Sequence, residues 1–501
     1  MDSVTKNYLD SPSKKPLDSV TKNSIDITLL GSKRSWITQQ GELMSTTYRV
    51  QNPATDEIVE TFDAATDAEV EGALAKAAAA YREWSARPMS ERAEIVARVA
   101  ALFAERKEEL AKIAAEEMGK PISEGIEEAE FSAAIIKYYA DNGEEFTKDQ
   151  SIPTGANGTA VIRRLPIGPL LGIMPWNFPY YQIARFVGPN LVLGNTIVLK
   201  DAEICPRSAL AVQKIMDDAG IPEGVYNNIF ATHDQISTII ADPRIQGVSL
   251  TGSERAGSIV GAQAGQHLKK AVLELGGSDP YILLDTDDVK EAAKLAWTTR
   301  MYNTGQACNS NKRMIVMEDI YDEFVAELTK LAEAAKAAPA DAQGENTYSC
   351  LSSRGAAENL HDQIQRAVKE DATLRAGGEL ADKGAFISPA VITDIPVGSD
   401  IYYEEFFGPV AVVYKVSSDE EALDLANNTQ FGLGGTVFSK DTERAAAISR
   451  RLEVGMANVN TPAGEGEELP FGGVKRSGFG RELGPLGMDE FVNKQMYYVE
   501  G

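Results

Sequence analysis

The stretch NTGQACNSNKR, residues 303–313, contains a cysteine suited to nucleophilic chemistry. Small and amide side chains surround Cys308, a setting typical of an accessible thiol. A nucleophilic cysteine needs a base, and that base is most often histidine. The three histidines of the chain are all distant from residue 308 in the sequence. The sequence therefore does not indicate a histidine-assisted cysteine. The alternative is that Cys308 is a buried packing residue, which is the more common role of a cysteine considered alone.

Two other short motifs contain groups that can complete a reaction at a carbonyl. In LELGG, Glu274 lies in an apolar strand and is followed by two glycines. A carboxylate there is either a satisfied structural partner or a base with a raised pKa. In PWNFP, Asn177 lies between an aromatic residue and a proline, where its amide can donate to an oxyanion or simply belong to a turn.

Further motifs have the composition of a nucleotide site. In SLTGSERAGSIVGAQAG, Gly252 falls where a strand turns into a helix, so backbone N–H groups can approach a pyrophosphate. The pattern is not G-x-G-x-x-G, and an ordinary βα turn is the alternative. In LKDAE, Lys200 and Glu203 follow a strand and can hold a ribose diol, or belong to a solvated turn.

Helical and strand patterns alternate along most of the chain. Ala-rich amphipathic patterns predict one helix over 67–85 and a second from about Ser90 to Gly119. From residue 167 onward, short apolar runs are followed by helices or turns, and a second such series extends from about 280 to 470. This βα alternation predicts doubly wound parallel sheets with a nucleotide crevice at the strand ends. The segment 151–168, rich in Gly, Pro and β-branched residues, predicts a separate β-excursion.

Composition excludes several classes of function. The formal net charge of −25 over 501 residues, without a basic stretch, argues against a nucleic-acid partner. No apolar run approaches the roughly 20 residues of a membrane span. Cys205, Cys308 and Cys350 form neither a disulfide framework nor a metal-binding spacing, so we expect no metal site and a reducing, cytoplasmic setting.

The first 43 residues differ in composition from the rest of the chain. The polar sequence DSVTKN occurs twice, at 2–7 and 18–23, and no apolar segment of a signal peptide is present. We interpret residues 1–43 as a disordered extension, an upstream mis-start or a cloning remnant, with Met44 as a plausible native start.

Five motifs occur in an order that resembles the aldehyde dehydrogenase superfamily. They are PWNFP, LELGG, NTGQAC, EEFFGPV and PFGGVKRSGFGRELG, and the similarity covers about residues 47–499. VLELGGSDP and NTGQAC with its following KR look most like the succinate-semialdehyde dehydrogenase branch. The resemblance implies NAD(P)-dependent oxidation of an aldehyde to a carboxylic acid. The alternatives are another aldehyde (glutarate semialdehyde, betaine aldehyde or an aliphatic aldehyde) and a non-catalytic structural family member.

The resemblance also implies a role for each candidate site residue. Cys308 attacks the aldehyde to give a thiohemiacetal and then a thioester, the Asn177 amide and the Cys308 N–H stabilise the oxyanion, and Glu274 activates the hydrolytic water. The expected cofactor is NAD, with NADP as an alternative, because Glu203 would repel a 2′-phosphate. The cofactor-binding residues implied are Trp176, Lys200, Glu203, Gly252, Ser253, Leu275, Glu405 and Phe407.

The expected substrate residues are Arg185, Arg300 and Phe471. Succinic semialdehyde carries a carboxylate, and the planar guanidinium of an arginine suits that group best. Arg185 follows Asn177 by eight residues, the position of an arginine in succinate-semialdehyde enzymes; a helix-surface ion pair is the alternative. Arg300 is the weaker second candidate. Some branch members have their second arginine six residues before the cysteine, where this chain has Tyr302, so the alternative is that Arg300 points elsewhere.

The implied fold is an aldehyde dehydrogenase-like α/β architecture. The cofactor domain comprises 44–147 and 167–276, the catalytic domain 277–476, and a small β oligomerisation element 148–166 and 477–501. This element implies a homodimer or homotetramer.

The chain departs from the family pattern at three places. Phe186 replaces a lysine of many relatives, which puts a proton path from that lysine through Glu482 in doubt. Ser310 excludes a disulfide switch with Cys308, and LKDAE lacks the proline found in many relatives.

Overall fold

The computed structural model describes residues 47–501 except 156, 343, 345 and 465. The expected extension over residues 1–43 lies outside the described residues. A short antiparallel hairpin of β1 (Tyr48–Asn52) and β2 (Glu57–Phe62) comes first. Among the described residues, no helix is both long and apolar enough to cross a bilayer.

The first large sheet has the parallel arrangement expected from the sequence. Its order is β19-β9-β8-β5-β6-β7, and β19 is antiparallel to its neighbour β9. The strand order reverses at β5, because the chain continues to β6 on one side and to β8 on the other. A reversal of this kind creates a crevice at the carboxyl ends of the two diverging strands. The strands are β5 (Pro169–Ile173), β6 (Thr196–Lys200), β7 (Tyr226–Asn228), β8 (Gly247–Thr251), β9 (Lys270–Glu274) and β19 (Gly478–Phe479).

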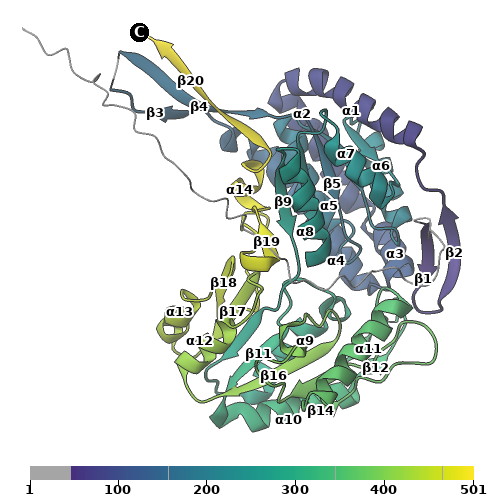
Figure 1. Cartoon of the computed structure of the whole chain (residues 1–501), viewed down its shortest axis with the longest axis vertical. Coiled ribbons are helices and arrows are strands. Elements are labelled where there is room, and N and C mark those ends of the chain that lie inside the picture. Colours follow the sequence, from purple (N-terminus) through teal and green to yellow (C-terminus); the bar gives the residue numbers. More distant parts are fainter. Residues whose placement is uncertain (1–46, 156, 343, 345, 465) are drawn as a thin grey trace, which may run out of the picture. The chain divides into compact units, whose positions relative to one another are not determined.

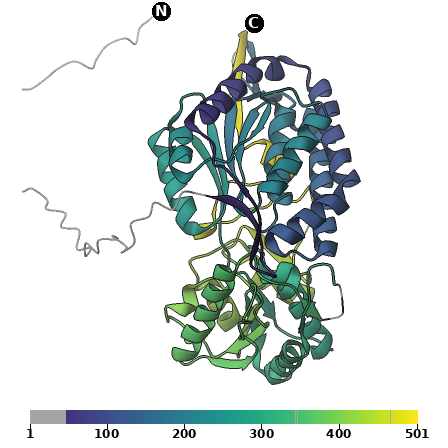
Figure 2. The same ribbon diagram turned by 90° about the vertical axis from the view of Figure 1, so that its right-hand side faces the viewer.

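Helices cover both faces of this sheet (Figure 2). Successive strand residues such as Leu170 and Leu171 are both buried but belong to opposite hydrophobic clusters. The strands therefore read as continuous apolar runs rather than alternating patterns. One face packs against α1 (Asp67–Ala86), α7 (His233–Ala241) and α8 (Glu254–Gln266). The other packs against α2 (Met89–Glu105), α3 (Lys107–Met118), α4 (Ile122–Phe146), α5 (Tyr181–Leu193) and α6 (Pro206–Asp218).

The single helix predicted from about Ser90 to Gly119 is wrong. The structure divides this segment into α2 and α3 at Arg106, whose backbone (φ −98°, ψ 13°) leaves the helical region. The Arg106 guanidinium forms a 2.6 Å ion pair with Asp218 of α6. The apolar period continues through the break, which is why the sequence pattern does not reveal it.

The second large sheet also has helices on both faces (Figure 1). Its order is β14-β15-β16-β11-β10-β17-β18, and only the β14–β15 pairing is antiparallel. The strands are β10 (Pro280–Leu283), β11 (Arg313–Met317), β14 (Thr373–Ala376), β15 (Ala390–Thr393), β16 (Val410–Val416), β17 (Gly434–Phe438) and β18 (Met456–Val459). The helices are α9 (Val289–Met301) and α10 (Glu318–Ala334) on one face, and α11 (Arg354–Lys369), α12 (Asp419–Asn427) and α13 (Thr442–Ser449) on the other.

The β-excursion and the last strand form a third sheet. β20 (Val492–Glu500) pairs antiparallel with β4 (Gly158–Pro166) along its whole length, and β3 (Gln150–Ile152) pairs with the other edge of β4. The three strands extend together away from the helices (Figure 1). Their role in oligomerisation and the domain boundaries stay predictions. The remaining short elements are β12 (Lys336–Ala337), β13 (Thr347–Tyr348), α14 (Gly484–Met488) and the 3₁₀ turns η1 (Tyr302–Gly305), η2 (Ile401–Tyr403) and η3 (Lys475–Ser477).

Candidate active site

Cys308 follows a backbone turn with unusual conformation. Asn303, Thr304 and Gly305 have φ of 50°, 53° and 75°, in the left-handed region that non-glycine residues rarely adopt. At Gly305 a side chain would overlap the Gly408 carbonyl, so only glycine fits. The Asn303 N–H donates to the Glu124 carboxylate at 2.7 Å, which fixes the start of the turn.

Arg300 holds this turn from behind. Its guanidinium is fully buried and donates to the carbonyl oxygens of Gly305 (3.0 Å) and Gly408 (2.6 Å), and to Ser310 Oγ (3.0 Å). Further bonds reach the carbonyls of Val410 and Phe406. Arg300 does not line the pocket beside Cys308. The expectation that Arg300 contacts substrate is therefore corrected, because its donors are already used to support the backbone.

Asn177 lies where the loop after β5 meets the cysteine loop. Its Nδ2 donates to the Gln306 carbonyl at 3.0 Å, and Asn303 Nδ2 donates to the Asn177 carbonyl at 2.9 Å. An amide nitrogen carries two hydrogens, so one Asn177 hydrogen remains for another acceptor. The structure thus brings Asn177 and the Cys308 loop together, as the sequence motifs predict.

Glu274 ends strand β9 as a buried carboxylate. Neither of its oxygens has a hydrogen-bond partner among the described residues. Gly472 packs directly against this carboxylate, where any side chain would collide with it. Burial and the charge of Glu482 raise the pKa of Glu274 well above its usual range, while Arg185 and Arg481 oppose the rise.

Arg185 lies behind the pocket wall rather than in it. Its Nε pairs with Glu482 Oε2 at 2.8 Å, and its guanidinium carbon lies 4.5 Å and 4.3 Å from the ring centres of Tyr181 and Phe471. Nη1 donates to the Tyr181 hydroxyl at 3.3 Å, and Nη2 donates to Gln182 Oε1. The alternative interpretation, a helix-surface ion pair, is wrong, because the Arg185–Glu482 pair is buried. Direct exposure of Arg185 to the pocket, expected from the sequence, is also not seen.

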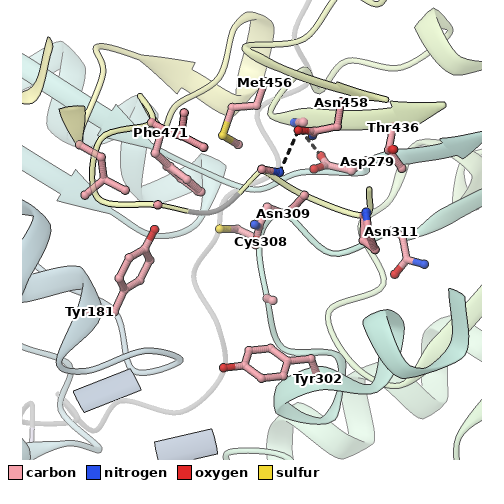
Figure 3. A pocket seen from close by; sticks show the side chains of 18 of the residues that line it. Tyr181, Asp279, Tyr302, Cys308, Asn309, Asn311, Thr436, Met456, Asn458 and Phe471 are labelled. Atoms are coloured by element: carbon pink, nitrogen blue, oxygen red, sulfur yellow. Dashed lines mark hydrogen bonds between the residues drawn. The ribbon is translucent and has the colours of Figure 1, made fainter. Parts of the chain in front are cut away.

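The pocket at Cys308 has a volume of about 220 Å³. Cys308 lies between Tyr181 and Phe471 on one side and Asp279, Asn311 and Thr436 on the other (Figure 3). Among the described lining residues, the charged side chains are all acidic: Glu127, Glu128 and Asp279.

The electrostatics at Cys308 set two effects against each other. Burial raises the pKa of the Cys308 thiol to about 11, while the positive charges of Arg185 and Lys312 favour the thiolate. Lys312 donates to the Cys308 carbonyl at 2.7 Å and is fully enclosed. Neighbouring cations of this kind can give a thiol more thiolate character without a histidine.

The crevice of the first sheet has the features of a dinucleotide site. Gly252 follows β8, the space beside its Cα is open, and Ser253 caps α8 by accepting from the Ala256 N–H at 3.3 Å. Open space at a helix N-terminus fits a pyrophosphate. Leu275 packs closely against Gly257 of the same helix.

The ends of β6 and of the η2 segment supply further polar groups. Lys200 Nζ lies 2.6 Å from Glu203, and the exposed His233 approaches the same carboxylate at 3.5 Å. Burial would raise the pKa of Glu203, but the Lys200 charge outweighs it and lowers that pKa. Glu405 accepts from the Gly277 N–H at 3.2 Å.

The aromatic residues expected to hold the cofactor also meet. The rings of Trp176 and Phe407 make an edge contact, with centroids 5.7 Å apart. This contact joins the loop after β5 in the first sheet to the segment that leads into β16 in the second.

Sequence reasoning missed four residues of this site: Tyr181, Gln182, His233 and Lys312. Tyr181 and Gln182 precede Arg185 by one helical turn, a spacing that places them on the same helix face. That spacing was the available signal. His233 gave none. Lys312 belongs to the KR that follows NTGQAC, but its contact with the Cys308 carbonyl could not be predicted, because only the fold brings the two groups together.

The fold and the comparisons define a class of enzyme, an NAD(P)-dependent oxidoreductase. The sequence matches the model of the aldehyde dehydrogenase family over residues 36–497, and the chain belongs to that family.

Relatives with stated activities cover nearly the whole chain. The NADP(+) succinate-semialdehyde dehydrogenase of Deinococcus radiodurans is 48% identical over 447 residues, 89% of this chain and 93% of that protein. The NAD(P)+ succinate semialdehyde dehydrogenase of Escherichia coli is 40% identical, over 90% of this chain and 97% of that protein. The crystal structure of succinic semialdehyde dehydrogenase from Streptococcus pyogenes with NADP+ is 41% identical, with a TM-score of 0.88, and covers 91% of this chain and 100% of that one.

The Arg185–Glu482 pair yields a prediction about the Cys308 thiol. Glu482→Gln removes the negative charge that balances Arg185, so the thiol pKa should fall, and Arg185→Met should raise it. A lower thiol pKa shifts iodoacetamide alkylation to lower pH, because each unit increases the thiolate fraction about tenfold well below the pKa. The exposed Glu144→Gln is the control. Shifts of the same sign in both variants would contradict this electrostatic account.

Proposed function

We propose that this enzyme oxidises succinic semialdehyde to succinate with a nicotinamide dinucleotide. The observation that carries the proposal is the Cys308 thiol in a pocket, within electrostatic reach of a buried carboxylate, Glu274, that has no hydrogen-bond partner among the described residues. The stated activities of the relatives support the choice of aldehyde.

Cys308 begins the reaction by attacking the aldehyde carbon. A carbon–sulfur bond forms and the carbonyl oxygen takes the negative charge of an alkoxide. The free hydrogen of the Asn177 amide and the Cys308 N–H stabilise that oxygen, because fixed donors aimed at developing charge lower the barrier. The bound nicotinamide supplies a hydride acceptor, so that the carbon attached to Cys308 becomes that of a thioester.

Glu274 then serves hydrolysis of the thioester. Its raised pKa makes it a better base than an ordinary carboxylate, and it takes a proton from the attacking water. Cys308 leaves as the thiolate and the acid is released. Gly252 and Ser253 would hold the pyrophosphate, Lys200 and Glu203 the adenosine ribose, and Trp176, Leu275, Glu405 and Phe407 the nicotinamide half.

The roles of the nucleophile and the base predict different kinetic defects. Cys308→Ala should abolish turnover while the protein stays folded. Glu274→Gln should release about one equivalent of reduced cofactor in a rapid burst and then turn over very slowly, because the thioester accumulates. Stopped-flow absorbance measures the burst, and thermal unfolding confirms the fold. Full steady-state activity of the alanine variant would refute the assignment.

Cofactor choice depends on the Glu203 carboxylate. We propose a preference for NAD over NADP, because Glu203 keeps its charge beside Lys200 and would repel a 2′-phosphate. The exposed His233 and Lys200 act in the opposite sense as cations, and the relatives named above use NADP or both cofactors.

Replacing Glu203 tests this preference. Glu203→Ser should raise the ratio of kcat/KM for NADP to that for NAD by about tenfold or more, the size of one charge–charge contact. Glu203→Gln, which keeps the shape, is the matched control and should move the ratio in the same direction. An unchanged ratio in both would show that another residue selects the cofactor.

We propose that the substrate carboxylate binds to the part of the pocket wall that lies in front of Arg185. Gln182 lines the pocket, and its Nε2 has no hydrogen-bond partner among the described residues. Its Oε1 faces Arg185, which only donates, so the amide orientation is fixed. Tyr181 likewise accepts from Arg185 and keeps its own O–H to donate. Arg185 thus orients the Gln182 amide and the Tyr181 hydroxyl so that both can donate to a substrate carboxylate. The Phe471 ring packs against the Arg185 guanidinium.

An aldehyde pair separates recognition of the carboxylate from general damage. Arg185→Met and Gln182→Met should lower kcat/KM for succinic semialdehyde, the former roughly a hundredfold. Gln182→Met should leave kcat/KM for butanal within about threefold of the wild type, because butanal presents no distal charge. Arg185→Met should also slow butanal oxidation, because the Cys308 thiol loses a nearby cation, but by a smaller factor than it slows succinic semialdehyde oxidation. Equal losses on both aldehydes in both variants would show that neither residue recognises the carboxylate.

The acidic lining of the pocket favours one second candidate. Glu127 and Asp279 line the cavity, and no lysine, arginine or histidine does so among the described lining residues. A cationic aldehyde such as betaine aldehyde suits that lining. The same aldehyde panel decides between the two, because betaine aldehyde would then give the higher kcat/KM.

A further inference from the structure

Lys312 is a buried cation next to the nucleophile. It lies four residues after Cys308, immediately before β11, and only 2% of its surface is exposed. Its Nζ donates to the Ala307 carbonyl at 2.7 Å and to the Cys308 carbonyl at 2.7 Å, and lies 3.1 Å from Glu405 Oε1. An ammonium has three hydrogens, so these three acceptors satisfy it completely.

The contact with Ala307 has a consequence for the Cys308 N–H. The Ala307 carbonyl and the Cys308 N–H belong to the same planar peptide unit, in which they point in opposite directions. An ammonium at the carbonyl oxygen therefore fixes the plane of the unit with the N–H directed away from Lys312. The positive charge also polarises the peptide, which makes the N–H a stronger donor.

The neighbouring cations, Arg313 and Arg300, contact other carbonyl groups. Arg313 points its guanidinium at the carbonyls of Ser278, Leu425 and Ala426, away from the cysteine loop. Arg300 supports the turn before Cys308 through Gly305. Among the described residues, Lys312 is the cation that reaches the carbonyl paired with the Cys308 N–H.

The third contact links the cysteine loop to the cofactor site. Glu405 accepts a hydrogen bond from the N–H of Gly277, a residue just after strand β9, which ends at Glu274. The Glu405 carboxylate also pairs with Lys312. Lys312 therefore spans the loop of the nucleophile and the segment expected to hold the nicotinamide ribose.

We propose that Lys312 is a positioning residue for the oxyanion hole, which orients and polarises the Ala307–Cys308 peptide so that the Cys308 N–H donates to the oxygen of the thiohemiacetal. The proposal rests on the proposed function of Cys308 as the nucleophile. The residue acts on the oxyanion through the peptide and does not itself contact substrate.

Two reactions of Cys308 separate this role from a general effect on the thiol. Reduction of cofactor in the first turnover passes through an oxyanion, whereas alkylation by iodoacetamide forms none. Lys312→Met should shift alkylation to higher pH, because a cation near the thiol is lost. It should also lower the burst rate constant about a hundredfold, more than the fall in alkylation rate at the same pH. The exposed Lys330→Met is the control.

The burst is measured with whichever aldehyde the wild type oxidises fastest, so an error in the choice of succinic semialdehyde does not affect the test.

Lys312→Arg keeps a cation and Lys312→Gln keeps only a donor. The burst rate constant should therefore decrease in the order Arg, Gln, Met if thermal unfolding is unchanged. If Lys312→Met does not fold, the Arg and Gln variants decide. A burst loss equal to the alkylation loss, or equal bursts in Arg and Gln, would overturn the proposal. If these results overturn the proposal for Lys312 while Cys308→Ala is inactive, the proposed function of Cys308 still stands.

Discussion

The reactive thiol depends on a turn that is unfavourable by itself. Asn303 and Thr304 are both left-handed, at a cost of about 1–2 kcal/mol each, and a β-branched threonine is a particularly poor choice there. The turn persists because buried cations bind its carbonyl groups from behind. Arg300 holds the carbonyl of Gly305 and Lys312 holds those of Ala307 and Cys308. The Cys308 loop is thus stabilised by charge–carbonyl contacts rather than by secondary structure.

A buried ion pair also lies near the thiol. Arg185 and Glu482 neutralise each other in an apolar surrounding formed partly by Tyr181 and Phe471. Buried pairs contribute little net stability, because desolvation offsets the attraction. The pair has another consequence here: both of its charges act on the pKa of Glu274, and the charge of Arg185 also acts on the pKa of Cys308, with little screening. Arg185 thus places a positive charge near Glu274, although Phe186 occupies the position of the lysine found in many relatives.

The sequence predicts the large features well for physical reasons. Both sheets are buried on two faces, so their strands appear as apolar runs, and Gly252 and Glu274 lie at strand ends where function concentrates. The break at Arg106 is invisible because the helical period continues across it. The positions of Arg185 and Arg300 are also invisible, because residue type indicates a charge but not which atoms it contacts. Arg300 meets carbonyls of residues more than a hundred positions away, and only the fold brings them there.

The pairing of β19 with β9 ties the order of folding to the site. Gly478 pairs directly with Glu274, and the same late segment supplies Phe471 and Glu482, while β20 completes the sheet started by β4. These contacts join residues that are more than 200 positions apart, and such non-local pairings form slowly. A chain that lacks residues 471–500 contains the strands β5 to β9 of the first sheet but not β19. It also lacks Glu482 and Phe471, which contact Arg185 in the complete structure. The side chains of Cys308 and Glu274 therefore reach their native surroundings only after most of the chain has been synthesised.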